Sequence, residues 1–212
     1  MNIFCLAVFM GSALTSFYAV EKRRPGLLAL AKPLTTLALI GVAGFPPEGF
    51  FNGMIAAGLL FSLGGDIALL SDKDKPFLIG LSLFLLAHLC YIVAFLGQAR
   101  WASFMMPGSL FLGLTALLFV RILWPGLGGL KIPVVVYAAA ITTMVTLALG
   151  LVPGPLPKQA ALCGAAGALL FYLSDANLAW AKFKNNYPRA ELVTLSLYWA
   201  GQLGIALAAS SG

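Results

Sequence analysis

The stretch FSLGGDIALLSDKDKPFLIGLSLFLLAHLCY, residues 61–91, contains two apolar runs separated by a short charged turn. Asp66 lies near the end of the first run, and His88, the only histidine in the chain, lies in the middle of the second. An ionisable group inside a membrane-crossing segment is costly, so it usually faces the interior of a helix bundle and serves a function. The stretch therefore predicts two membrane helices, each with a buried polar group.

The whole chain has the composition of an integral membrane protein. Of its 212 residues, 61% are hydrophobic and 9% are charged, against roughly 25% charged in a soluble domain. The net charge of +6 comes from basic residues scattered among apolar runs, which fits loop anchoring, and we expect no nucleic-acid partner. The N-terminal run has no Lys or Arg before Glu21, so we expect a retained span and not a signal peptide. Three cysteines lie in apolar runs without CxxC spacing, which predicts small core residues: Cys5, Cys90 and Cys163.

Several apolar runs are close to the length of about 20 residues that crosses a bilayer as a helix. Breaks rich in Pro, Gly and charge separate them, and no loop is long enough for a soluble domain. The fifth run can begin anywhere within residues 101–106. The sequence predicts an all-α polytopic membrane protein, a single integral membrane domain over 1–212, with eight transmembrane helices at roughly 3–20, 27–44, 50–71, 77–97, 104–124, 132–151, 159–181 and 190–209.

Basic residues are distributed unevenly between the two sets of loops. Ten lie in or beside the loops after the first, third, fifth and seventh runs, whereas the alternate loops hold only Arg100 and Lys158. Loops rich in Lys and Arg stay in the cytoplasm. We therefore expect both termini outside the cytoplasm.

This orientation places several polar side chains in the cytoplasmic half of the bundle. Lys32, Asp66 and Asp175 each lie about five residues, or roughly 8 Å, inside the cytoplasmic end of their helices. Tyr198 is slightly deeper, and His88 and Gln202 approach the midplane. We expect these groups to converge.

Two pairs of runs share a pattern that indicates a duplication. Asp66 and Asp175 each follow an Ala-Ala-Gly motif at the same distance, and the next runs align so that His88 corresponds to Gln202. The halves have an even number of spans, so a pseudo-twofold axis would run along the membrane normal. Asp66 and Asp175 would then face each other at equal depth. We expect a four-plus-four parallel repeat with halves of about 1–100 and 101–212.

Stripes of side chains at helical spacing can also be plain packing faces, with glycines that allow close helix approach. For Asp66 and Asp175 one alternative is a structural pair with Lys32. The other is that each is a carboxylate near a helix end whose side chain extends toward water. His88 can be a hydrogen-bonded core histidine. A metal site at Asp66, Asp175 and His88 is a further alternative, but close ligand spacing is lacking and we expect no metal.

Two neighbouring carboxylates in a low-dielectric site cannot both ionise easily, so one remains an acid beside a base at neutral pH. This arrangement suits acid-catalysed hydrolysis. Proton-coupled transport of a small solute or lipid and intramembrane aspartyl proteolysis can use it as well. The residues alone leave these three functions open.

An ordered set of motifs resembles the YhhN-like family of membrane proteins, which includes the lysoplasmalogenases. The resemblance runs from about Lys32 to Gln202, and the order and spacing of the short motifs make it specific. Gly201, where the family pattern favours Ala, is a small departure. The motifs are Lys32-Pro33, Gly64-Gly65-Asp66, the stripe Phe77/Gly80/Phe84/His88/Tyr91, Phe171/Ser174-Asp175 and Tyr198/Gln202.

The resemblance implies hydrolysis of the vinyl ether bond of a lysoplasmalogen with an ethanolamine or choline headgroup. The products would be a fatty aldehyde and a glycerophospho-base, and the reaction requires no cofactor. One of Asp66 and Asp175 would be the acid and the other the base, and His88 and Tyr91 would position the water or tune the pair. Lys32 would attract the lipid phosphate. Other expected substrate contacts are Tyr91, Ser174, Tyr198 and Gln202.

The expected partners are a lysophospholipid substrate and the lipid bilayer, and the sequence does not fix the oligomeric state. The expected location is the inner (plasma) membrane of a bacterium, with the site in the cytoplasmic half.

Overall fold

The computed structural model describes residues 2–71, 73–100 and 107–210. Within these ranges it has eight helices long and apolar enough to cross a membrane, and no strand. The predicted all-α membrane fold is confirmed, although residues 101–106, where the start of the fifth helix was uncertain, lie outside the described ranges. The helices are α1 (Ile3–Glu21), α2 (Pro25–Ala43), α3 (Gly49–Ala68), α4 (Asp74–Leu96), α5 (Pro107–Leu123), α6 (Lys131–Leu149), α7 (Lys158–Phe183) and α8 (Ala190–Ser210), with short 3-10 turns η2 (Trp124–Gly126) and η3 (Gly128–Leu130) between α5 and α6.

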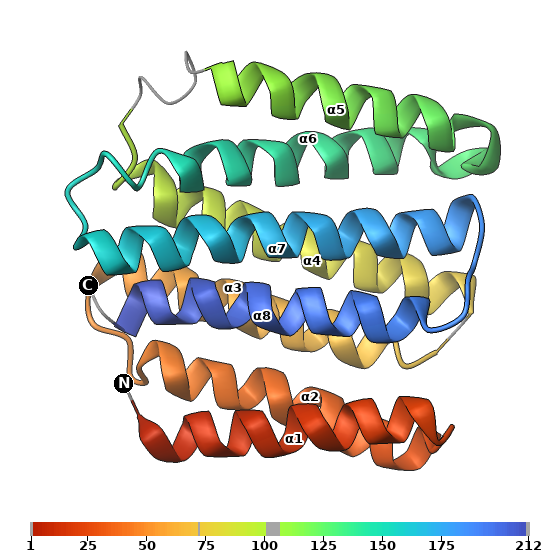
Figure 1. The fold of residues 1–212 in the computed structure, drawn as a ribbon, viewed down its shortest axis with the longest axis horizontal. Helices are drawn as coiled ribbons and strands as arrows, with labels where there is room; N and C mark the ends of the chain where they lie inside the picture. Colours follow the sequence, from red (N-terminus) through yellow and green to blue (C-terminus); the bar gives the residue numbers. More distant parts are fainter. Residues whose placement is uncertain (1, 72, 101–106, 211–212) are drawn as a thin grey trace.

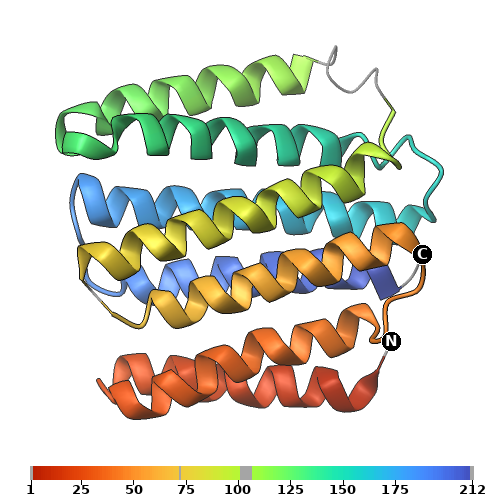
Figure 2. The ribbon, with the colours of Figure 1, turned by 180° about the vertical axis from the view of Figure 1, so that it is seen from behind.

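The helices run side by side along one axis, so that their backbone hydrogen bonds are satisfied within each segment, as a bilayer requires (Figure 1). Helices α7 and α8 lie in front of α4 and α3, with the pair α1–α2 at one edge and α6–α5 at the other (Figures 1 and 2). Helix α2 packs against α8, and α6 packs against α4. The centre of the bundle is therefore built from α3, α4, α7 and α8. The four-plus-four duplication stays a prediction.

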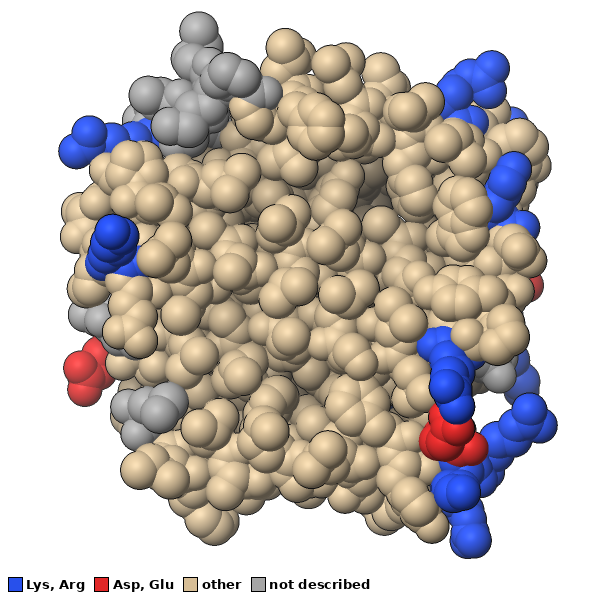
Figure 3. Space-filling model, viewed as in Figure 1, with Lys and Arg blue, Asp and Glu red and all other residues tan. Residues whose placement is uncertain are grey.

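Charged side chains are concentrated at the ends of the bundle. The loops after α1, α3, α5 and α7 lie at one end, and the start of α1 and the end of α8 lie at the other (Figures 1 and 2). In the space-filling view most Lys and Arg gather at the first end, and a broad uncharged band covers the middle (Figure 3). This is the surface of an integral membrane protein. Which end faces the cytoplasm stays a prediction.

Helices α7 and α8 approach so closely that their backbones touch at glycines. A Cβ atom on Gly201 would lie 2.7 Å from the backbone nitrogen of Phe171 and 2.9 Å from the carbonyl oxygen of Gly167. Both neighbours are backbone atoms, which cannot move aside as a flexible side chain can. An alanine at position 201 therefore does not fit this bundle without a shift of one helix.

We expect Gly201→Ala to lower the free energy of unfolding by about 1–3 kcal/mol, the usual cost of overpacking a close-packed interior. Thermal unfolding of the purified protein in detergent measures it. Gly11→Ala is the matched control, because a Cβ atom at Gly11 meets nothing within 4 Å. Equal melting temperatures for the two variants would show that α7 and α8 can separate without cost.

Candidate active site

A polar cavity of about 300 Å³ enters the bundle from the end that carries the α3–α4 and α7–α8 loops. Asp66 on α3 and Asp175 on α7 both line it. Its other polar lining residues include Lys32 on α2, Ser174 on α7 and Tyr198 on α8, and nearer the opening Ser71, Lys182, Asn186, Glu191 and Thr194. The structure thus brings side chains from four helices, separated by up to 166 positions in the sequence, to one cavity.

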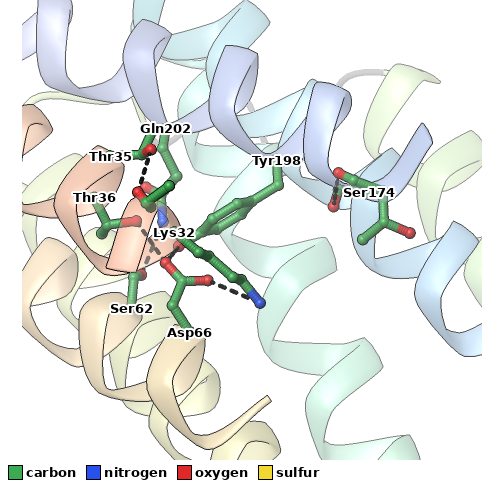
Figure 4. A network of polar contacts seen from close by, with 10 residues as sticks. Lys32, Thr35, Thr36, Ser62, Asp66, Ser174, Tyr198 and Gln202 are labelled. Atoms are coloured by element: carbon green, nitrogen blue, oxygen red, sulfur yellow. Dashed lines mark hydrogen bonds and ion pairs between the residues drawn. The ribbon is translucent and has the colours of Figure 1, made fainter. Parts of the chain in front are cut away.

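Asp66 is held by three neighbours and is only 1% exposed. Thr36 and Tyr198 donate hydrogen bonds to its Oδ2, at 2.5 and 2.8 Å, and the Lys32 Nζ lies 3.6 Å from its Oδ1 (Figure 4). A nearby cation and two hydroxyl donors all stabilise a negative carboxylate. The pairing with Lys32 that the sequence left as an alternative is therefore present, and it lies on the wall of the cavity.

Asp175 has a different environment. Tyr137 on α6 donates a hydrogen bond of 2.5 Å to its Oδ2, and the Nε2 of His88 lies 3.7 Å from the same oxygen. The side chain of Asp175 is 13% exposed, so it is more accessible from the cavity than Asp66. Among the described residues, no Lys or Arg lies within ion-pair distance of this carboxyl group.

His88 is fully buried behind Asp175 and lies among aromatic rings. Its ring centroid is 4.7 Å from that of Phe171 and 5.1 Å from that of Tyr137. Neither ring nitrogen has a hydrogen-bond partner among the described residues. The backbone of Phe84, four residues earlier on α4, is also close enough to interact with the ring, so the alternative of a hydrogen-bonded core histidine stays a prediction. The Asp175 carboxyl group is the acidic group that His88 faces.

Three aromatic rings form the floor of the site. The rings of Phe84, Phe171 and Tyr198 meet edge to face, with centroid distances of 5.4 to 6.1 Å. Phe84 and Tyr198 also line the polar cavity. The rings exclude solvent from one side of the two aspartates, which strengthens electrostatic interactions within the site.

The other predicted contacts lie farther from the two carboxyl groups. Tyr91 donates a 2.7 Å hydrogen bond to the Oε1 of Gln202, whose Nε2 donates a 2.8 Å bond to the Oγ of Ser62. Tyr91 and Gln202 are fully buried and do not line the cavity. Ser174 lines the cavity, but its hydroxyl donates to the backbone oxygen of Thr194 at 3.0 Å and so joins α7 to α8.

Sequence reasoning missed two groups that touch the aspartates. Thr36 lies four residues after Lys32 on the same face of α2, and this spacing was the signal that could have found it. Tyr137 is a single hydroxyl in an otherwise apolar part of α6, and no local pattern points to its contact with Asp175.

The absence of a metal at Asp66, Asp175 and His88 stays a prediction. Within residues 2–71, 73–100 and 107–210, no three side chains of His, Cys, Asp or Glu come together as a metal-binding group.

Comparisons with known proteins identify the family of the chain. The sequence model of the YhhN family matches residues 27–209. Lysoplasmalogenase TMEM86B of Sus scrofa is 33% identical over 185 residues, which are 86% of this chain and 75% of the relative. The Homo sapiens protein of the same name is 34% identical over 189 residues, 85% of this chain and 74% of the relative. A lysoplasmalogenase of Mycobacterium bovis is 31% identical over 192 residues, 86% of this chain and 67% of the relative.

No solved structure matches the fold significantly. The family assignment therefore rests on sequence similarity that covers α2 to α8 and includes every side chain of the polar cavity. The chain belongs to the YhhN family of membrane proteins.

Proposed function

We propose that the protein is a lysoplasmalogenase, an enzyme that hydrolyses the vinyl ether bond of a lysoplasmalogen. Relatives of this name match most of the chain. The observation that carries the chemistry is that Asp66 and Asp175 line one cavity in different electrostatic environments. Such a pair divides the roles of acid and base.

Asp175 is the general acid in this proposal. It has no Lys or Arg within ion-pair distance among the described residues, and a buried charge without such a partner is costly, so the neutral, protonated carboxyl is favoured. Vinyl ether hydrolysis begins with proton transfer to the alkenyl carbon that is not bonded to oxygen. The Asp175 proton forms that new C–H bond, and the oxygen-bearing carbon becomes an oxocarbenium ion. The hydrogen bond from Tyr137 fixes the orientation of the acid.

Asp66 is the base. Its negative charge, maintained by Lys32, Thr36 and Tyr198, stabilises the oxocarbenium ion across the cavity. Water then adds to the oxygen-bearing carbon and gives a proton to Asp66. The resulting hemiacetal breaks its bond to the glycerol oxygen, which takes the proton that the hemiacetal hydroxyl loses as the aldehyde forms. The proton that Asp66 received from water returns to Asp175 through the cavity, so one water is consumed per bond cleaved and both carboxyl groups regain their starting states.

The headgroup of the lysolipid would bind along the polar wall of the cavity. Lys32 lies beside Asp66, and Lys182 lies nearer the end that carries the basic loops. Lys32 and Lys182 therefore border the region that a lysolipid phosphate would occupy, a few ångströms above its vinyl ether, together with the carboxylate of Glu191. Lys182 also pairs with Asp74 at 3.6 Å. We assign this end of the cavity to the cytoplasmic side of a bacterial inner membrane, because the loops there carry most of the Lys and Arg.

Aldehyde release by the purified protein tests the function. We expect cleavage of a 1-alkenyl lysophospholipid and none of its saturated alkyl ether, which has no alkenyl carbon to protonate. The ester-linked lysolipid should also survive, because among the described residues no serine or cysteine is hydrogen-bonded to His88 as an activated nucleophile would be. Cleavage of the ester at a similar rate would contradict the mechanism. Proton-coupled uptake of a solute or lipid by proteoliposomes, without aldehyde, would favour a transporter. Cleavage of a peptide would favour a protease.

A further inference from the structure

A second recess lies against the polar cavity, between α4, α5, α6 and α7. It is a narrow groove with about 80 Å³ of free space, and its walls are aliphatic and aromatic side chains, among them Leu81, Val120, Val134 and Ile141. Among the described residues that line the groove, Asp175 is the one that can carry a charge at neutral pH. An apolar groove that ends at a carboxyl group is suited to an amphiphilic molecule.

The groove and the polar cavity lie side by side and share part of their lining, including Phe77, Phe84, Leu178 and Asp175. The polar lining around Lys32 and Lys182 therefore lies on one side of Asp175, and the apolar walls of α5 and α6 lie on the other. The change from polar to apolar lining takes place at the candidate acid.

We propose that this groove binds the first part of the hydrocarbon chain of the lysolipid, with the headgroup in the polar cavity. The inference rests on the proposed function. In a 1-alkenyl lysolipid the vinyl ether joins the polar glycerol to the apolar chain, so the reacting bond is the polar–apolar boundary of the substrate. In the protein that boundary lies at Asp175. When the polar–apolar boundary of the lipid lies at the polar–apolar boundary of the protein, the vinyl ether lies beside Asp175. This placement does not require a specific contact to every carbon of the chain.

The length of the groove limits how much of the chain it holds. On α6 the wall extends from Val134 to Ile141, seven residues or about 10 Å along a helix. A longer chain must continue past the groove. Helix α5 is the outermost helix on this side (Figure 1), so the remainder of the chain can enter the bilayer beside it. Chain-length preference should therefore rise over short chains and then level off.

The test compares a variant whose new side chain fills the groove with a variant that carries the same change at the neighbouring residue. Ala138 lines the groove, whereas Ala139, the next residue of α6, is exposed on its outer face and does not line it. Ala138→Phe should lower the ratio of kcat/KM for a long-chain lysoplasmalogen over a short-chain one at least about tenfold, as expected when a close-packed site is overfilled. Ala139→Phe should leave this ratio unchanged. Ala116→Leu fills the opposite wall on α5 and provides a second variant that does not adjoin Tyr137.

A binding measurement separates this inference from the catalytic proposal. The saturated alkyl ether lysolipid cannot be cleaved, and its binding can be followed by the melting temperature of the protein at increasing ligand concentration. The rise in melting temperature on ligand binding should grow with the length of the alkyl chain in wild type and in Ala139→Phe. In Ala138→Phe and Ala116→Leu the rise should not depend on chain length. If all four proteins respond alike, the chain stays in the bilayer or detergent and the groove proposal is wrong. If the binding pattern holds but wild type releases no aldehyde, the proposed function fails while the chain site stands.

Discussion

Asp175→Asn is expected to lower kcat for lysoplasmalogen cleavage by more than about a hundredfold, the lower end of what a positioned general acid contributes. An amide has no proton acidic enough to transfer to an alkenyl carbon. The variant should still fold, because an asparagine oxygen can accept the hydrogen bond from Tyr137 that Asp175 accepts now. Aldehyde release under saturating substrate measures the effect. In wild type, solvent deuterium should slow the reaction, since proton transfer to carbon is the expected barrier.

Glu48→Gln provides the matched control for this change. Glu48 is an exposed carboxylate in the loop between α2 and α3, at the end of the bundle away from the polar cavity. Replacing it with an amide makes the same chemical change outside the site and should leave kcat unchanged. Turnover near that of wild type in Asp175→Asn, or an equal loss in both variants, would remove Asp175 from the role of acid.

The sequence predicted the helices because a bilayer allows few alternatives. A run of apolar residues between charged breaks must close its own backbone hydrogen bonds, so the eight expected spans and the observed helices agree within a few residues. The buried stripe on α4 was predicted for a related reason. Spacings of three and four residues put Phe77, Phe84 and His88 on one face, and all of them are buried.

The partners of each carboxyl group could be predicted only in part. The depths of Lys32, Asp66 and Tyr198 followed from the positive-inside rule and the rise per residue, and the structure brings these three together. Depth does not fix rotation about a helix axis. It therefore did not show that Gln202 would bond to Tyr91 and Ser62, away from the cavity, while Tyr137 reached Asp175.

The two unequal environments of the aspartates were also hidden in the sequence. The repeat predicted that Asp66 and Asp175 would be equivalent, and both do line the cavity. Their neighbours differ because Lys32 lies against Asp66, whereas the side chains around Asp175 are Tyr137 and His88. This difference depends on which side chains of α2 and α6 face the centre. It decides which carboxyl group we assign as acid.

Asp66→Asn is expected to reduce both activity and stability, and the two effects can be separated. The loss of kcat should again exceed about a hundredfold, because an amide cannot take the proton of the attacking water. The variant also leaves the buried ammonium of Lys32 without its carboxylate. Removing one partner of a buried ion pair typically costs about 3–5 kcal/mol. Thermal unfolding in detergent and aldehyde release measure the two effects on the same preparation.

The double variant Asp66→Asn with Lys32→Met distinguishes catalysis from folding. Methionine has a similar unbranched shape and no charge, so the double variant should recover most of the melting temperature that Asp66→Asn loses. It should not recover kcat, because the base is still absent. If activity returned together with stability, Asp66 would be a structural partner of Lys32 and the base would have to be another group. Recovery of stability without recovery of kcat would show that Asp66 acts in catalysis in addition to its structural pairing with Lys32.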